Sequence, residues 1–185
     1  MQKERNMGNI VAVVGMCGSG KSVVTEVFTE RGWKSVYFGG VTMKIIAEEG
    51  LEKTPENEKI IREGLRAKYG MAAYAVKLED EIRALAEKGD VVLDGLYSWS
   101  EYKYLSEKIG GIVLLAIVTD SGDRYDRLAV REVRPFTYEQ SMARDIAEIE
   151  NLEKGGPIAF AHKYIHNNGD IEKLRAKTVE FIESL

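Results

Sequence analysis

The sequence has few of the residues that cross-link a chain, bind metal or interrupt helices: one cysteine, two histidines and three prolines among 185 residues. A single cysteine, Cys17, excludes an internal disulfide and a zinc site built from several thiolates. A chain without disulfides suits reducing surroundings, so we expect a cytoplasmic protein. No segment approaches the roughly 20 apolar residues that a membrane helix needs, and no membrane partner is expected.

An excess of basic residues is also absent. The chain carries 26 lysines and arginines against 30 aspartates and glutamates, a formal net charge of -4. A dedicated nucleic-acid-binding domain would be basic, so we expect no nucleic-acid partner. Hydrophobic residues make up 44% of the chain and charged residues 30%, which is typical of globular proteins. The length favours one domain spanning residues 1–185.

Short apolar runs alternate with segments of helical spacing along the chain. The runs lie at residues 10–14, 35–38, 91–93, 112–118 and, more weakly, 161–166. Helical spacing covers residues 23–30, 56–69, 72–87 and 171–183. Ser98 with Glu101, and Thr137 with Gln140, have the spacing of capping boxes at two further helix starts. This alternation predicts an α/β fold with a doubly wound, mostly parallel sheet.

Residues 15–22 carry the most specific motif, because they fit G-x-x-x-x-G-K-[ST] between a predicted strand and a predicted helix. Glycines let backbone N–H groups converge on a polyphosphate, and the following helix presents its positive end to the same anion. Lys21 can reach the β- and γ-phosphates, and the Ser22 hydroxyl can bind Mg²⁺. We therefore predict ATP and Mg²⁺ as cofactors. The candidate nucleotide-binding residues are Gly15, Cys17, Gly18, Ser19, Gly20, Lys21 and Ser22.

Asp94 follows the apolar run of residues 91–93 and precedes Gly95. At the carboxyl end of a parallel strand, it should lie beside the phosphate loop. Two roles stay open for this carboxylate: it helps to hold Mg²⁺, or it acts as a general base on the second substrate. An ordinary aspartate that starts a turn is the alternative.

Arginines are available to surround a transferred phosphoryl group. Arg131, Arg134 and Arg144 flank a predicted helical hairpin over residues 124–154, a candidate lid whose break lies at residues 134–136. Arg62 and Arg66 lie four residues apart and would share a helix face. Such side chains can bind a phosphate bidentately. For Arg124, which neighbours interleaved acids, a solvated helix face is an equally good interpretation.

Other classes of phosphate-loop protein lack support in this sequence. It has neither the N-K-x-D tetrapeptide that reads guanine nor an L-S-G-G-Q segment of transporter ATPases. The length also leaves no room for the helical subdomain of a ring ATPase. With residues 15–22, Asp94-Gly95 and the arginine-bearing segment in place, the chain resembles the P-loop nucleotide kinases, most of all the adenylate kinase-like and dephospho-coenzyme A kinase-like branch.

The resemblance extends over residues 39–40, 54–66, 92–95 and 167–169 and implies further features. They are five parallel strands in the order 2-3-1-4-5 and a small helical lid over the donor. Arg131 would be a lid arginine, Arg66 and Gly40 would lie at the acceptor, and the turn containing Asn168 would lie near the donor base. The acid that often follows the second strand in these kinases is replaced here by Gly39-Gly40.

The leading hypothesis is an enzyme that transfers the γ-phosphoryl group of ATP to a small nucleotide-like acceptor. No acid follows the second predicted strand, so no carboxylate there could take a proton from a hydroxyl acceptor. A phosphate acceptor needs no such base, and Arg62 and Arg66 could hold it. Both observations favour a nucleoside monophosphate. Phosphorylation of the hydroxyl of dephospho-coenzyme A is one alternative. A regulatory ATP-binding protein with little turnover is another. A kinase acting on nucleic-acid ends is disfavoured by the acidic balance.

Overall fold

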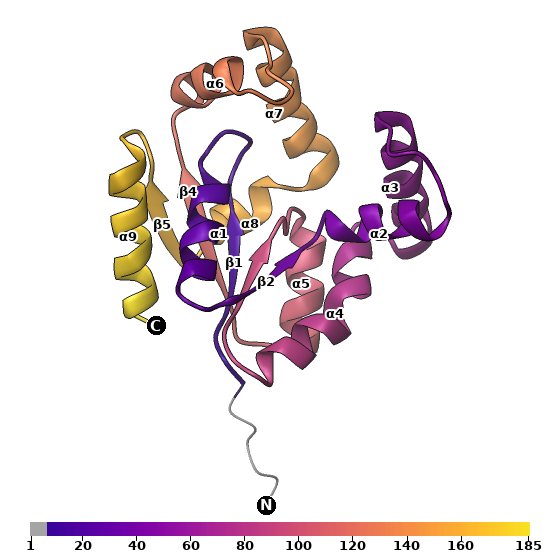
Figure 1. The fold of residues 1–185 in the computed structure, drawn as a ribbon, viewed down its shortest axis with the longest axis horizontal. Coiled ribbons are helices and arrows are strands. Elements are labelled where there is room, and N and C mark those ends of the chain that lie inside the picture. Colours follow the sequence, from indigo (N-terminus) through magenta and orange to yellow (C-terminus); the bar gives the residue numbers. More distant parts are fainter. Residues whose placement is uncertain (1–6) are drawn as a thin grey trace, which may run out of the picture.

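The computed structural model describes residues 7–185 (Figure 1), and residues 1–6 lie outside the described part of the chain. Its centre is a five-stranded sheet in the order β2-β3-β1-β4-β5, and every neighbouring pair runs parallel. The strands are β1 (Ile10–Val14), β2 (Lys34–Tyr37), β3 (Val91–Asp94), β4 (Ile112–Val118) and β5 (Lys163–His166). The predicted α/β class and the strand order are thereby confirmed.

The central strand β1 explains why helices cover both faces of the sheet. All of its residues are at most 2% exposed. Because successive side chains of a strand point to opposite faces, an apolar residue at every position needs cover on both sides. Ile10, Ala12 and Val14 pack toward α4 (Ala73–Ala86) and α5 (Trp99–Lys108). The intervening valines pack toward α1 (Lys21–Glu30) and α9 (Ile171–Glu183).

Local capping signals place several helix starts where the sequence predicts them. Helix α3 (Pro55–Tyr69) begins after Thr54, whose hydroxyl accepts a hydrogen bond from the backbone N–H of Asn57 at 3.2 Å. Both predicted capping boxes are present, at the starts of α5 and of α7 (Tyr138–Leu152). Helix α2 (Gly40–Glu48) has no side-chain cap and no acid in its first turn, so no such signal announces it.

Two helical pairs project beyond the end of the sheet at which β1 ends (Figure 1). On one side lie α2 and α3, and on the other lies a hairpin of α6 (Ser121–Val130) and α7. The short helix α8 (Gly155–Ala159) then leads into β5. The hairpin turns at residues 131–137, where Arg134 has a left-handed φ of 52°. Among residues 7–185, no helix is long and apolar enough to cross a membrane.

Candidate active site

The loop of residues 15–22 connects β1 to α1 at the carboxyl edge of the sheet. Gly18 and Gly20 have φ values of 79° and 101°, in the left-handed region that favours glycine. A Cβ at Gly20 would lie 2.5 Å from Asn167 Nδ2, and one at Gly18 would lie 2.9 Å from the backbone oxygen of Arg124. Backbone conformation and crowding by neighbours therefore both require glycine at these two positions.

Asn167 anchors this loop to the end of β5. Its side-chain amide donates a hydrogen bond to the backbone oxygen of Ser19 at 2.8 Å, and the Thr119 hydroxyl donates to the same oxygen at 3.1 Å. Asn168, predicted to lie near the donor base, is exposed, and its Oδ1 accepts from the backbone N–H of Asp120 at 3.4 Å. Sequence reasoning thus found the right turn but missed the residue of that turn that contacts the loop.

Lys21 and Asp94 lie close enough for their charges to interact beneath the loop. The Lys21 ammonium donates to the backbone oxygen of Met16 at 2.9 Å. Burial, reinforced by the positive charge of Lys154, lowers the pKa of Lys21 to about 8. Burial also raises the pKa of Asp94, against the pull of Lys21. With the exposed Ser22 at the start of α1, the site offers hydroxyl and carboxylate oxygens, a donor set that fits Mg²⁺.

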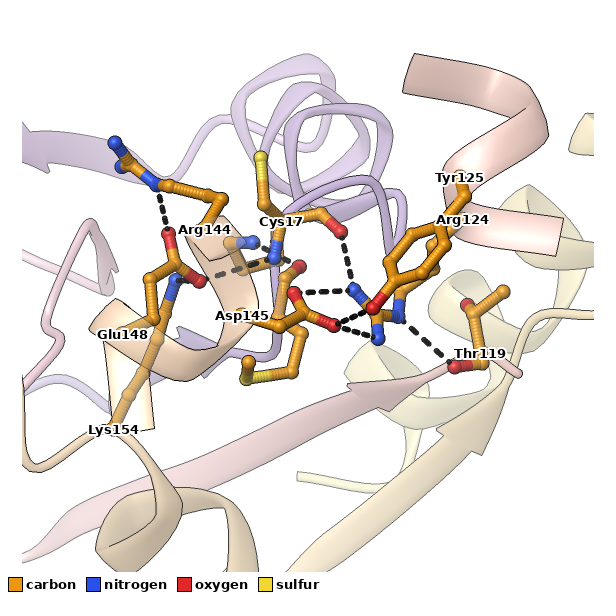
Figure 2. A network of polar contacts seen from close by, with 10 residues as sticks. Cys17, Thr119, Arg124, Tyr125, Arg144, Asp145, Glu148 and Lys154 are labelled. Atoms are coloured by element: carbon orange, nitrogen blue, oxygen red, sulfur yellow. Dashed lines mark hydrogen bonds and ion pairs between the residues drawn. The ribbon is translucent and has the colours of Figure 1, made fainter. Parts of the chain in front are cut away.

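A buried glutamate from the hairpin also reaches the loop (Figure 2). The Glu148 carboxylate accepts hydrogen bonds from the backbone N–H of Cys17 at 3.3 Å, from Lys154 Nζ at 2.6 Å and from Arg144 Nε at 2.9 Å. Burial raises the pKa of Glu148, but the two cations outweigh burial and hold this pKa below its usual value. Glu148 is therefore an ionised carboxylate that accepts a hydrogen bond from a backbone N–H of the phosphate loop.

A second buried ion pair ties the hairpin together and to the loop. The Arg124 guanidinium meets both carboxylate oxygens of Asp145, joining α6 to α7, and also donates to the backbone oxygen of Cys17 at 3.0 Å. The Tyr125 hydroxyl donates to Asp145 at 2.9 Å. Arg124 is only 5% exposed, so the solvated-face interpretation of this residue is wrong. Asp145 lies 21 residues after Arg124, so the spacing of residues along one helix cannot predict this pair.

A cavity of about 360 Å³ lies between the loop side of the sheet and the pair α2 and α3. Four predicted arginines line it together: Arg62, Arg66, Arg134 and Arg144. Gly95 and Tyr97 also line the cavity, so its lining begins one residue after Asp94. This convergence brings arginines from α3, from the hairpin turn and from α7 to one cavity.

Other sequence-predicted residues lie outside this cavity lining. The Arg131 guanidinium lies over the Phe136 ring, 4.4 Å from its centroid, within the hairpin turn. Gly39 lines the cavity, whereas Gly40 lines a separate hollow beside α4. An acid is also present, contrary to what the end of β2 suggests. Glu58 of α3 is 8% exposed, and its carboxylate pairs with Arg62 at 3.4 Å and with Arg134 at 3.9 Å.

Glu101 is a second acid in the cavity lining and is 4% exposed. Burial raises its pKa to about 7, although its carboxylate accepts hydrogen bonds from the backbone N–H groups of Ser98 and Tyr97, both at 2.8 Å. The capping-box pattern predicts its contact with the helix start. Its place in the cavity follows only from the packing of α5.

Comparisons with known proteins identify the family and the fold of this chain. A family model described as "AAA domain" matches residues 11–152. A protein named "UPF0200 protein" from Thermococcus gammatolerans is 34% identical over 184 residues, covering 95% of each chain. The dephospho-CoA kinase from Campylobacter jejuni is 18% identical, with a TM-score of 0.58 over 96% of this chain and 97% of that one.

A gluconokinase from Sinorhizobium meliloti is a further structural neighbour, 16% identical with a TM-score of 0.58, covering 96% of this chain and 92% of its own. At such identities the two kinases establish likeness of fold alone. They bear out the resemblance to P-loop kinases that the loop motif and the arginine-bearing segments indicate. The long match to the family model and the 34% identity to the Thermococcus protein go further. The chain belongs to the AAA-domain family and to the UPF0200 proteins, and it has a P-loop kinase-like fold.

Proposed function

We propose that the protein transfers the γ-phosphoryl group of ATP to a phosphate-bearing, nucleotide-like acceptor, a nucleoside monophosphate in the first instance. The observation that carries the proposal is a cavity lined by four arginines whose lining begins one residue after Asp94. The charge of Lys21, in the phosphate loop, acts on Asp94 itself. A kinase of this kind works mostly by positioning two anions and neutralising their charge.

On the donor side, the backbone N–H groups of residues 15–22 would cradle the phosphates, and Lys21 would meet the β- and γ-phosphates. Ser22 and Asp94 would hold Mg²⁺, which neutralises charge on the phosphates when it is bound. The lowered pKa of Lys21 rises again once a polyphosphate lies beside it, because an adjacent negative charge favours the protonated amine.

On the acceptor side, the arginine set favours a phosphate over a hydroxyl. A phosphate monoester is already an anion near neutral pH and needs no base, but it must be held against repulsion by the donor. The two acids in the cavity lining are poorly suited to act as a base. Glu58 is paired with Arg62 and Arg134. The Glu101 carboxylate already accepts hydrogen bonds from the backbone N–H groups of Tyr97 and Ser98 at the start of α5.

The hairpin of α6 and α7 fits the role of a lid, because it carries arginines toward both anion sites. Arg144 lines the cavity and also meets Glu148 beside the loop, and Arg134 lines the cavity from the hairpin turn. Closure of the hairpin would bring these guanidinium groups onto the transferring phosphoryl group, together with Arg131. Exclusion of water would then strengthen every charge interaction within the site.

The decisive experiment is a phosphoryl-transfer screen with ATP and Mg²⁺. It covers ribo- and deoxyribonucleoside monophosphates, dephospho-coenzyme A and a reaction without acceptor. We expect a nucleoside diphosphate as product, and Lys21→Ala should abolish transfer without unfolding the chain. A product phosphorylated on a hydroxyl, lost in Asp94→Asn, would establish the dephospho-coenzyme A kinase type of reaction instead. ATP turnover only in the reaction without acceptor would favour a regulatory ATP-binding protein.

Arg66→Ala tests the acceptor site, with Lys59→Ala as a matched control that removes one exposed positive charge from the same helix. Arg66→Ala should lower kcat/KM for the acceptor about tenfold to a hundredfold, as the loss of a charge-assisted bond implies. The KM for ATP should stay nearly unchanged. An equal loss in both variants would mean that general charge, and not the cavity, determines acceptor use.

A further inference from the structure

Glu148 holds the position of an anion at the nucleotide site. Its carboxylate lies on the Cys17 N–H, inside the loop whose N–H groups suit phosphate oxygens. Two cations, Arg144 and Lys154, complete its surroundings (Figure 2), and the charge of Lys21 also acts on it. A carboxylate that accepts from a loop N–H and from basic side chains reproduces the contacts that a phosphate would make there.

Burial makes this arrangement more than a surface ion pair. Glu148 is 2% exposed and Lys154 is 3% exposed. The Lys154 ammonium also lies 4.5 Å from the centroid of the Tyr97 ring, and Tyr97 lines the cavity. A buried Lys154 ammonium without a partner would destabilise an empty site by its desolvation, and Glu148 offsets that cost.

The contacts of Glu148 differ in strength. On the hairpin side it is held by charge-assisted bonds of 2.6 Å to Lys154 and 2.9 Å to Arg144, whereas its bond to the Cys17 N–H is 3.3 Å long. The loop contact is thus the one most easily given up. A polyphosphate carries several negative charges and can offer oxygens to the N–H group and to both cations at once.

We propose that Glu148 is an intramolecular stand-in for phosphate, which donor nucleotide must displace, and that displacement transfers Lys154 and Arg144 from Glu148 to the phosphates. This inference rests on the proposed function for the identity of the donor. Lys154 becomes a further phosphate-binding residue of the transfer reaction, and Glu148 becomes the residue that keeps both cations in position while the donor is absent. Donor affinity is therefore reduced by the competition of the chain's own carboxylate.

The test measures binding of inorganic tripolyphosphate and of ATP by titration calorimetry, without any acceptor. Glu148→Gln keeps the shape of the side chain but removes its charge, and it should tighten tripolyphosphate binding by about tenfold or more. Glu150→Gln is the control, because it removes one acid from an exposed position two residues along the same helix. Its effect should be less than about twofold.

Glu148→Asp serves as a second variant in case the glutamine variant does not fold. It keeps the charge that the buried Lys154 needs but withdraws the carboxylate from Cys17, so binding should again tighten. Unchanged or weaker binding in folded Glu148 variants would overturn the proposal and leave Glu148 a structural ion-pair partner. Tripolyphosphate binding requires no acceptor, so a protein that fails the transfer screen can still pass or fail this test.

Discussion

Replacement of Arg124 by methionine should lower the free energy of unfolding by about 3–5 kcal/mol, because it leaves the Asp145 carboxylate buried without its charge partner. Asp145 is 8% exposed and would lose its ion pair while keeping the hydrogen bond from the Tyr125 hydroxyl at 2.9 Å. Asp145→Leu should cost about as much, since the Arg124 guanidinium would then be buried without its charge partner.

The double variant separates the ion pair from its surroundings. Two apolar side chains of similar size often replace a buried pair at little cost. The backbone oxygens of Cys17 and Thr119 would still lose their hydrogen bonds from Arg124, at about 1 kcal/mol each. We therefore expect a total loss of about 1–3 kcal/mol, less than either single variant and far below their sum.

Urea unfolding followed by both circular dichroism and tryptophan fluorescence measures these values, and coincident transitions support a two-state treatment. A loss below about 1 kcal/mol in Arg124→Met would place this pair among ordinary surface salt bridges. Additive losses in the double variant would show that the two residues act independently, and either result would refute the reasoning.

Two further predictions concern the cavity and the loop. Because the pKa of Glu101 is raised to about 7 in the folded protein, the folded state binds the proton more tightly than the unfolded state does. The free energy of unfolding should therefore fall as pH rises from about 4.5 to 7, by at most about 1.4 kcal/mol per pH unit. Glu101→Gln should flatten that slope, as urea titrations across this range would reveal, and an unchanged slope would exclude Glu101 as its source. Gly20→Ala should weaken ATP binding strongly while circular dichroism stays native, because its Cβ would lie 2.5 Å from Asn167 Nδ2; normal ATP affinity would contradict the close approach.

The sequence predicts those parts of the fold that depend on local pattern. The apolar β1, the glycine-rich loop and the capping boxes all have signals within a few residues of one another. Helix α2 lacks such a signal and forms through tertiary contacts. Among these, the Thr42 and Tyr74 hydroxyls share a hydrogen bond of 2.7 Å, and Ile46 is buried. No window of sequence around residues 40–48 contains that information.

The candidate site shows the same division. Periodicity places Arg62 and Arg66 on one face of α3, and both line the cavity. The role of Asn168 near the donor base stays a prediction. No local signal in the sequence indicates that Asn167 contacts the loop, because this contact joins residues 148 apart. The sequence predicts Glu148 as an ordinary i,i+4 partner of Arg144 on helix α7. Its contact with the Cys17 N–H follows only from the packing of α7 against the loop.

The hydrogen bond from Asn167 to the phosphate loop has a consequence for folding during synthesis. The Asn167 amide meets the backbone oxygen of Ser19 across 148 residues, and both sheet neighbours of β1 lie about 80 or more residues after it. Contacts so distant in sequence close late in folding. On a ribosome the loop emerges early but stays without its scaffold until β5 has been made. We therefore expect nascent chains that stop before Asn167 to be unable to capture ATP, so that binding competence arises only near the end of synthesis.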